Sequence, residues 1–209
     1  MTAETDAYVI DDDEAVRDSI KFLLRTAGIT VKTYDSAAAF LAVAPTISSG
    51  CVVTDVRMPG LSGIDLLRRL KEMQIGLPVI VITGHGDVPL AVEAMKCGAI
   101  DFLEKPFDDD VLLASVRSAL NRAEASAALE TERAEVRARI AALTQREHEV
   151  LDGLVAGHPN KIIAFDLSIS PRTVEIYRAN VMTKMKAGSL SELVRLTLVA
   201  GVMKSQTDG

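Results

Sequence analysis

The alternation of short apolar runs with segments of helical periodicity over the first 123 residues most constrains the fold. The apolar runs are 7–10, 29–34, 50–55, 77–84 and 99–106. Each is followed by a helical pattern, such as the recurrence of Val16, Ile20 and Leu24 in the first. Continuous apolar strands separated by helices are typical of a parallel sheet with both faces covered. We therefore predict a doubly wound α/β domain with five parallel strands, followed by an all-α part.

Polar residues follow four of these strands. Asp11 and Asp12 follow the first strand, Asp55 the third, Thr83 the fourth and Lys105 the fifth. Ligands of such sheets bind beyond the carboxyl ends of the strands, so these groups should converge. Bunched carboxylates repel one another unless a cation lies among them, and an all-oxygen site with room for phosphate suits Mg²⁺. Asp55 is thus predicted to accept a phosphoryl group, with Thr83 and Lys105 neutralising its charge.

Each of these residues has a simpler explanation when it is taken alone. An Asp after a strand, such as Asp55, is more often a turn or cap residue, and Asp13 is well placed to cap the next helix. Lys105, which precedes Pro106, could belong to a surface loop. The agreement of four strand ends favours the phosphate site.

The motifs DDD, TDVRMPGLSG, VITGHGD and FLEKPF carry a resemblance to a known family. Residues 8 to about 123 resemble the flavodoxin-like receiver domain of two-component response regulators. The resemblance implies that Asp12, Asp55 and the backbone carbonyl of Arg57 bind Mg²⁺, while Asp11 holds the ion largely through water. It also implies a receiver domain over residues 1–123.

The same resemblance assigns switching and assembly roles. Thr83 and Phe102 correspond to the pair that rearranges on phosphorylation, and Lys105 corresponds to a phosphate contact. Receivers often dimerise through the fourth helix and fifth strand when phosphorylated, which here implies Val92, Lys96 and Asp101. For that helix, a plain solvated surface is an equal alternative.

The segment 124–142 is rich in Ala, Glu and Arg and contains neither Pro nor Gly, which favours a helix. Leu129, Val136 and Leu143 recur at a heptad interval. The pattern is too short to require a coiled coil. We predict a semi-rigid helical linker, with a dimer-forming coil as the alternative.

Residues 143–209 are predicted to form four helices, with caps at Thr144 and Ser189 and Pro171 in the first turn of the third helix. This part has a net charge of +1, whereas the preceding residues carry −7. A short helix, a tight turn and a basic third helix are typical of a helix-turn-helix, and promoter DNA is the partner that this motif predicts.

A helical wheel divides the third helix into a core side, with Val174, Val181 and Met185, and an opposite side. The opposite side is predicted to read bases in the major groove, through Arg172, Glu175, Ile176, Ala179 and Thr183. Phosphate contacts are predicted for Lys161, Thr173, Arg178 and Lys184. The alternative is an ordinary amphipathic helix whose charges are solvated.

Residues 143 to about 201 resemble the LuxR-type helix-turn-helix, so the architecture is similar to the NarL/FixJ family. Glu175 and Ala179 occupy positions where other members can carry lysine, which leaves the base preference open. The runs TGHGDVPLAVEAMKCGAIDFLEKPF and SPRTVE closely resemble those of the FixJ members. That similarity implies a FixL-like sensor histidine kinase as phosphodonor and nitrogen-fixation regulatory genes as targets. Regulators of aromatic-compound metabolism share similar runs and remain the alternative.

The expected function is a phosphorylation-activated transcription factor that dimerises on promoter DNA, and we expect no enzyme. A phosphohydrolase would need a second acid two residues after Asp55, where this chain has Arg57. A DNA-binding protein that no longer switches is the other alternative. Neither a signal peptide nor a membrane span is evident, so we expect a cytoplasmic protein without a membrane partner.

Overall fold

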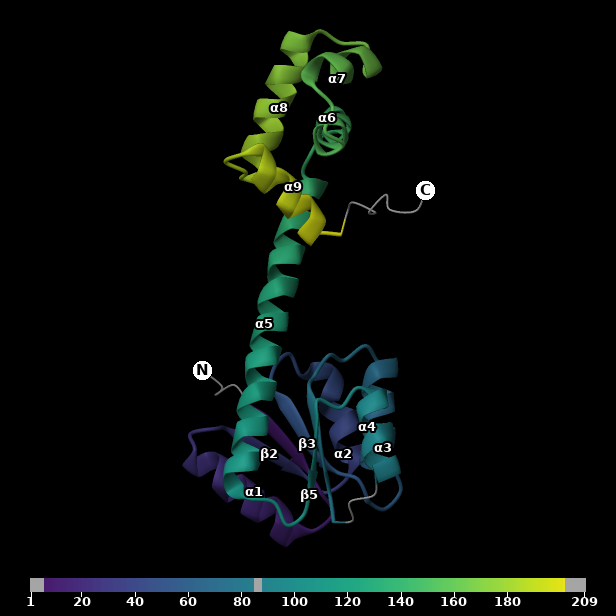
Figure 1. Cartoon of the computed structure of the whole chain (residues 1–209), viewed down its shortest axis with the longest axis vertical. Helices are drawn as coiled ribbons and strands as arrows, with labels where there is room; N and C mark the ends of the chain where they lie inside the picture. The colour runs from purple at the N-terminus through teal and green to yellow at the C-terminus, as the bar shows by residue number, and fades with distance from the viewer. Residues whose placement is uncertain (1–5, 85–87, 202–209) are drawn as a thin grey trace. The chain divides into compact units, whose positions relative to one another are not determined.

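A computed structural model describes residues 6–84 and 88–201 (Figure 1). Part of the VITGHGD motif, residues 85–87, lies outside the described residues. Contacts divide the chain into two compact units, Met1–Ala127 and Ala128–Gly209.

The first unit contains a five-stranded parallel sheet in the order β2-β1-β3-β4-β5, which confirms the predicted doubly wound fold. The strands are β1 (Ala7–Ile10), β2 (Val31–Tyr34), β3 (Cys51–Asp55), β4 (Val79–Thr83) and β5 (Asp101–Glu104). Asp55 is in register with Ile82 of β4, and Thr83 is in register with Glu104 of β5. The carboxyl ends of the three strands are therefore nearly level.

Helices cover both faces of this sheet (Figure 1). They are α1 (Glu14–Thr26), α2 (Ala37–Val43), the 3₁₀ helix η1 (Ala44–Thr46), α3 (Gly63–Glu72), α4 (Val88–Cys97) and α5 (Asp109–Ala141). Alternate residues of β1 serve the two cores, because successive strand side chains point to opposite faces. Ala7 and Val9 pack with residues of α1 and α5, whereas Tyr8 and Ile10 pack with residues of α2, α3 and α4.

Polar caps set the helix starts in this unit. Asp13 caps α1, as predicted, by accepting a hydrogen bond from the N–H of Ala15. Ser62 and Asp65 form a reciprocal capping box at the start of α3. Each cap satisfies backbone N–H groups that have no partner within the helix.

Helix α5 is continuous from Asp109 to Ala141, so the segment expected as a linker is helical. Its first part contributes Leu112 and Val116 to the core of the first unit, and its last part contributes Val136 and Ile140 to the core of the second. The contact boundary at Ala127 falls inside the segment 124–142.

The heptad residues of this segment are not equivalent in the structure. Val136 and Leu143 lie in the core of the second unit, while Leu129 is 40% exposed. Two of the three residues that would form the seam of a coiled coil are therefore already buried within the second unit.

The second unit contains the four predicted helices, α6 (Gln145–Val155), α7 (Asn160–Asp166), α8 (Pro171–Met185) and α9 (Leu190–Val199). The predicted capping box of Thr144 and Glu147 and the Ser189 cap are both present. Ser168 adopts a positive φ of 53° in the turn between α7 and α8. Among the described residues, no helix has the length and apolar character needed to span a bilayer.

Candidate functional site

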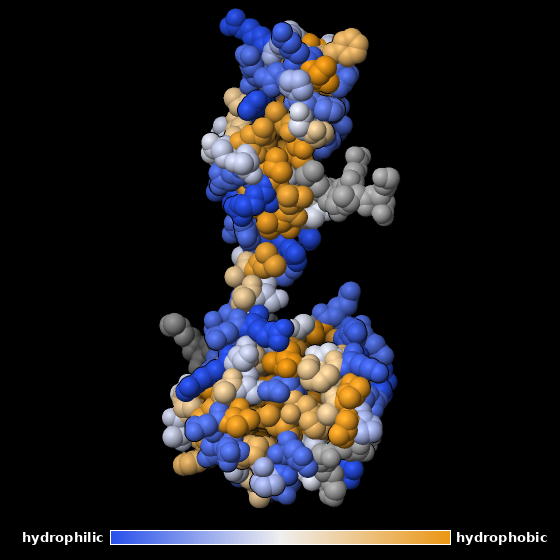
Figure 2. All heavy atoms as spheres, in the orientation of Figure 1, coloured by the Kyte–Doolittle hydropathy of each residue, from blue (hydrophilic) through white to orange (hydrophobic). Residues whose placement is uncertain are grey.

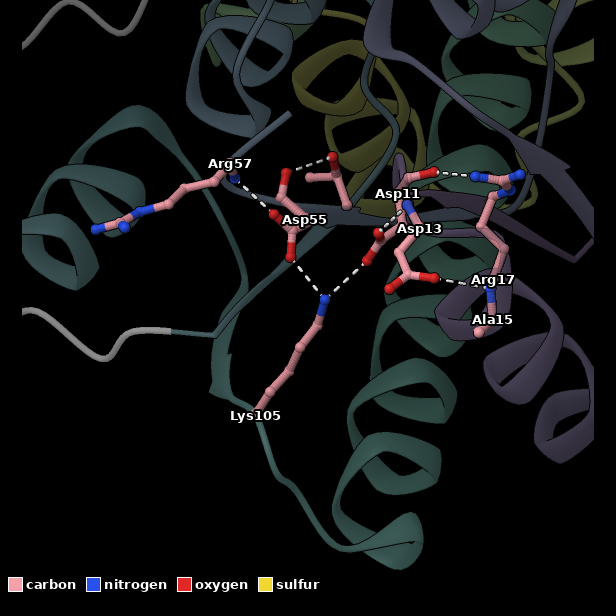
Figure 3. Close-up of polar contacts among 8 residues, drawn as sticks. Asp11, Asp13, Ala15, Arg17, Asp55, Arg57 and Lys105 are labelled. Carbon is pink, nitrogen blue, oxygen red and sulfur yellow. Dashed lines mark hydrogen bonds and ion pairs between the residues drawn. The ribbon is translucent and has the colours of Figure 1, made fainter. Parts of the chain in front are cut away.

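Two buried carboxylates meet one ammonium group at the carboxyl ends of the strands (Figure 3). The Nζ of Lys105 donates to Oδ1 of Asp55 at 2.7 Å and to Oδ2 of Asp11 at 2.8 Å. The side chain of Lys105 is 24% exposed. The structure therefore brings together residues from the ends of β1, β3 and β5, as the sequence predicts.

The backbone orients the remaining oxygens of both carboxylates (Figure 3). Oδ2 of Asp55 accepts the N–H of Arg57 at 2.6 Å, and Oδ1 of Asp11 accepts the N–H of Asp13 at 2.9 Å. The guanidinium of Arg17 donates to the backbone carbonyl of Asp11 at 2.7 Å. Sequence reasoning missed Arg17, because this contact depends on how α1 packs beside β1.

Gly63 places the start of α3 directly against the end of β3. Its N–H donates to the carbonyl of Val56 at 3.0 Å, and a Cβ at this position would collide with the backbone carbonyl of Asp55. Only glycine permits so close an approach without displacing the residue that carries the acceptor carboxylate. Sequence reasoning missed this role, although the Ser62-Gly63 pair at the start of the helix is a visible signal.

The electrostatics favour a charged Lys105. Partial burial by itself would lower the pKa of this ammonium group, but the hydrogen bonds and charges of Asp11 and Asp55 outweigh it. The net effect raises the pKa of Lys105 above its ordinary value. The site thus holds a fixed positive charge beside the carboxylate of Asp55 at neutral pH.

Of the three carboxylates predicted to cluster, Asp11 and Asp55 meet at Lys105. In the described part of the chain, no three His, Cys, Asp or Glu side chains are arranged to hold a metal ion. Lys105 provides the cation between Asp11 and Asp55, whereas Asp12 is exposed and lines a hollow of about 640 Å³ with Arg57. The donor chemistry still fits Mg²⁺, because these groups offer hard oxygen ligands on a side open to water.

The residues expected to switch lie on neighbouring strands. Thr83 is fully buried at the end of β4, and its backbone carbonyl accepts the N–H of Lys105 at 2.7 Å. Phe102 of β5 is partly buried and pairs in register with Val81. A backbone hydrogen bond thus connects Thr83 directly to Lys105, the expected phosphate contact.

The expected dimer residues Val92 and Lys96 are exposed on α4, and Asp101 is partly exposed on β5. Figure 2 shows hydrophobic residues at the surface over α4. The exposed hydrophobic residues of α4 include Val88, whose exposed fraction is 76%, and Met95, whose exposed fraction is 49%.

Helix α8 has the two sides that its sequence predicts. The core residues Val174, Val181 and Met185 are fully buried. The five residues expected to read bases are all exposed: Arg172, Glu175, Ile176, Ala179 and Thr183. Of the expected phosphate contacts, Lys161 is exposed on α7, and the hydroxyl of Thr173 lies 2.8 Å from that of Ser170.

Two other expected phosphate contacts have partners within the protein. Arg178 donates to the side chain of Asn160 at 3.4 Å. Lys184 forms a 2.6 Å ion pair with Glu147, the carboxylate of the α6 capping box. This pair lowers the pKa of Glu147, with the backbone hydrogen bond from Thr144 adding to the effect. Lys184 therefore ties α8 to α6.

Arginines near the end of α5 contact the carboxyl ends of two other helices, a role that sequence reasoning missed. Arg133 and Arg137 donate to the carbonyls of Val199 and Ala200 at the end of α9, each at 3.2 Å. Arg139 donates to the carbonyl of Met185 at the end of α8, at 3.3 Å. These cations satisfy carbonyls that lack partners within their own helices.

Comparisons with known proteins agree with this two-part arrangement. The model of the response regulator receiver domain matches residues 7–117, and that of the bacterial regulatory proteins of the luxR family matches residues 141–197. The chain is 58% identical to the transcriptional regulatory protein FixJ of Bradyrhizobium diazoefficiens, over 97% of this chain and 99% of that protein. The chain belongs to the FixJ-like response regulators. Its units are thus a receiver domain and a LuxR-type DNA-binding domain.

Other relatives of this response regulator support the assignment. It is 54% identical to FixJ of Rhizobium meliloti, over 93% of this chain and 95% of that protein. It is 43% identical to the response regulator protein TmoT of Ectopseudomonas mendocina, over 93% of this chain and 88% of that protein. The expected similarity to the FixJ members is confirmed.

Solved structures agree as well. Full-length FixJ from B. japonicum matches 97% of this chain and 100% of its own at 58% identity and a TM-score of 0.59. The response regulator StyR matches 94% of this chain and 99% of its own at 40% identity and a TM-score of 0.83. Receiver domains generally bind Mg²⁺ at the phosphorylation site, and the family is one of transcription regulators rather than a known class of enzyme.

Proposed function

We propose that Asp55 accepts a phosphoryl group from the phosphohistidine of a FixL-like sensor histidine kinase, in the cytoplasm. The contact between Lys105 and Asp55 is the observation that carries this proposal. The Arg57 N–H holds one oxygen of Asp55, so the carboxylate has a defined orientation before the donor arrives.

The chemistry is a transfer between two nucleophiles. A carboxylate oxygen of Asp55 attacks phosphorus, the bond to the histidine nitrogen breaks, and the product is an acyl phosphate. As negative charge passes from the carboxylate to the phosphoryl oxygens, the ammonium group of Lys105 follows it and contacts those oxygens. The hydroxyl of Thr83 donates a hydrogen bond to the same oxygens. Asp11, Asp12, Asp55 and the backbone carbonyl of Arg57 would hold Mg²⁺, which supplies further positive charge to the transferred group.

Phosphorylation would then activate the DNA-binding domain. Thr83 and Phe102 rearrange, the surface with Val92, Lys96 and Asp101 pairs two receivers, and the paired LuxR-type domains bind two half-sites. Similarity to the FixJ proteins supports nitrogen-fixation regulatory genes as the targets.

Sedimentation and promoter binding with and without acetyl phosphate and Mg²⁺ test this proposal. We expect the phosphodonor to drive dimerisation and to tighten DNA binding in the wild type but not in Asp55→Asn. Asp18→Asn, which removes an exposed carboxylate on α1, should behave as the wild type. If the wild type and Asp55→Asn bind DNA equally under all conditions, the receiver does not switch the protein.

A further inference from the structure

The exposed face of α8 that is expected to read bases, with Arg172, Glu175, Ile176, Ala179 and Thr183, carries one anionic hydrogen-bond acceptor. Of its five residues, Arg172 and Glu175 carry charged groups, and neither group makes a hydrogen bond or ion pair within the described part of the chain. The hydroxyl of Thr183 donates to the carbonyl of Ala179 at 2.9 Å. Ile176 is 58% exposed and Ala179 is also exposed. Besides the hydroxyl oxygen of Thr183, which can still accept, the carboxylate of Glu175 is therefore the charged acceptor that this face offers to a base.

A structural role does not account for Glu175. Arg172 and Arg178 lie three residues away on either side, at a spacing that favours helical ion pairs, yet neither pairs with it. The guanidinium of Arg178 donates instead to the side chain of Asn160. Glu147, by contrast, holds Lys184 and the start of α6. The carboxylate of Glu175 remains directed to solvent.

The phosphates of duplex DNA repel a carboxylate that faces them. A hydrogen-bond donor on a base can offset this repulsion. The major groove offers two, the N4 amino group of cytosine and the N6 amino group of adenine. Adenine places its N7 acceptor beside the amino group, and this lone pair repels a carboxylate. The carboxylate therefore selects cytosine. The neighbouring Ile176 is a hydrocarbon group, which in this groove matches the 5-methyl group of thymine.

The helix is fixed well enough to discriminate between bases. Ser170 caps the start of α8, Arg139 contacts the carbonyl of Met185 at its end, and Lys184 joins it to α6. Because contacts with α5, α6 and α7 fix the helix within its domain, the side chains of its exposed face approach the groove in one register. A mismatched base is then not relieved by a tilt of the helix.

We propose that Glu175 determines sequence specificity by accepting a hydrogen bond from the N4 amino group of a cytosine, while Ile176 packs on the methyl group of a thymine in a neighbouring base pair. This inference rests on the proposed DNA-binding function and names the bases that α8 reads. Repulsion between Glu175 and the phosphates also weakens binding to DNA that lacks the cytosine.

Selection from a randomised duplex library tests the role of Glu175. Full-length protein with acetyl phosphate and Mg²⁺ is compared with Glu175→Gln and with Asp152→Asn, which removes an exposed carboxylate on α6. The wild type and Asp152→Asn should enrich cytosine at one position of each half-site. Glu175→Gln should enrich adenine there, because glutamine pairs with its N6 and N7, with about a tenfold loss of the cytosine preference.

The outcomes separate this inference from the proposed function. If the wild type and Glu175→Gln select the same base at every position, the inference about Glu175 is overturned. The proposed DNA-binding function then still stands. A wild type that selects no sequence overturns the proposed function, and the inference with it.

A duplex with deoxyuridine in place of the contacted thymine tests Ile176. We expect the wild type to lose about fourfold in affinity, the effect of one buried methyl group. Ile176→Ala should bind the two duplexes equally. Equal losses for the wild type and Ile176→Ala overturn the assignment of thymine to Ile176.

Discussion

The Nζ of Lys105 lies 2.7 Å from Oδ1 of Asp55, so the proposed acceptor has its counter-ion in place before any phosphoryl group arrives. The same ammonium group contacts Asp11 at 2.8 Å. Two buried carboxylates thus share one cation, and removal of that cation leaves them repelling one another.

Lys105→Met should destabilise the receiver domain by about 1–3 kcal/mol, between the values for exposed and buried ion pairs. The raised pKa of Lys105 means that its contribution is complete below the ordinary value of 10.5 and is lost as pH rises through the raised pKa. The defect should therefore be present at pH 7. Thermal unfolding with and without Mg²⁺ measures it, and Mg²⁺ should restore more stability to Lys105→Met than to the wild type. Lys32→Met, at an exposed position of β2, is the control. Equal stability of the wild type and Lys105→Met would show that the pair contributes nothing.

Gly63→Ala should destabilise the receiver by about 1–3 kcal/mol, because overpacking at a backbone contact forces the chain to shift. The added methyl group would collide with the carbonyl of Asp55, so phosphorylation by acetyl phosphate should also slow. Gly76→Ala is the matched control, since a Cβ there meets no atom within 4 Å. Denaturant unfolding of both variants checks the prediction, which fails if the two midpoints coincide.

Val136→Ala should destabilise the DNA-binding domain by about 1–3 kcal/mol, because Val136 is 1% exposed in its core. Leu129→Ala, one heptad earlier and 40% exposed, should change stability by less than about 0.5 kcal/mol. Thermal unfolding of the full chain compares the two variants. If α5 were instead the seam of a dimer, both variants would weaken association by similar amounts.

A fragment that begins at Ala128 should be markedly more stable than one that begins at Leu143. The shorter fragment lacks Val136 and Ile140 from its core and the arginine contacts to the ends of α8 and α9. The loss of two buried aliphatic side chains alone predicts a difference of about 3–6 kcal/mol. Urea unfolding of both fragments measures it, and equal midpoints would mean that α5 is dispensable for this domain.

Glu147→Gln should lower the stability of the DNA-binding domain in a pH-dependent way. The pKa of Glu147 is held below its ordinary 4.5 by Lys184, so its contribution is complete above that value and is lost as pH falls through the lowered pKa. The receiver is identical in both proteins, so their difference reports this domain. Thermal unfolding between pH 3 and 7 should show curves that converge towards the acid end. A constant gap across this range would contradict a role for the charge.

Local patterns were sufficient for most of the architecture. The alternation of strands and helices, the caps at Asp13 and Thr144 and the division of α8 into two sides each depend on residues a few positions apart. Periodicity and capping are properties of local backbone geometry, so one chain is enough to identify them. The convergence of Asp11, Asp55 and Lys105 could also be predicted from the sequence, because parallel strands end at a common edge of the sheet.

Only the tertiary structure decided which partner each charged group takes. The sequence places Asp12 beside Asp11, but packing leaves Asp12 exposed and pairs Asp11 with Lys105. Packing likewise pairs Lys184 with Glu147, whereas Glu175 on the same helix has no partner within residues 6–84 and 88–201. Val136 fits a heptad as well as Leu129 does, yet α6 to α9 cover the first and not the second. Periodicity sets which side of a helix a residue occupies, whereas the distances between elements far apart in the chain determine what lies opposite it.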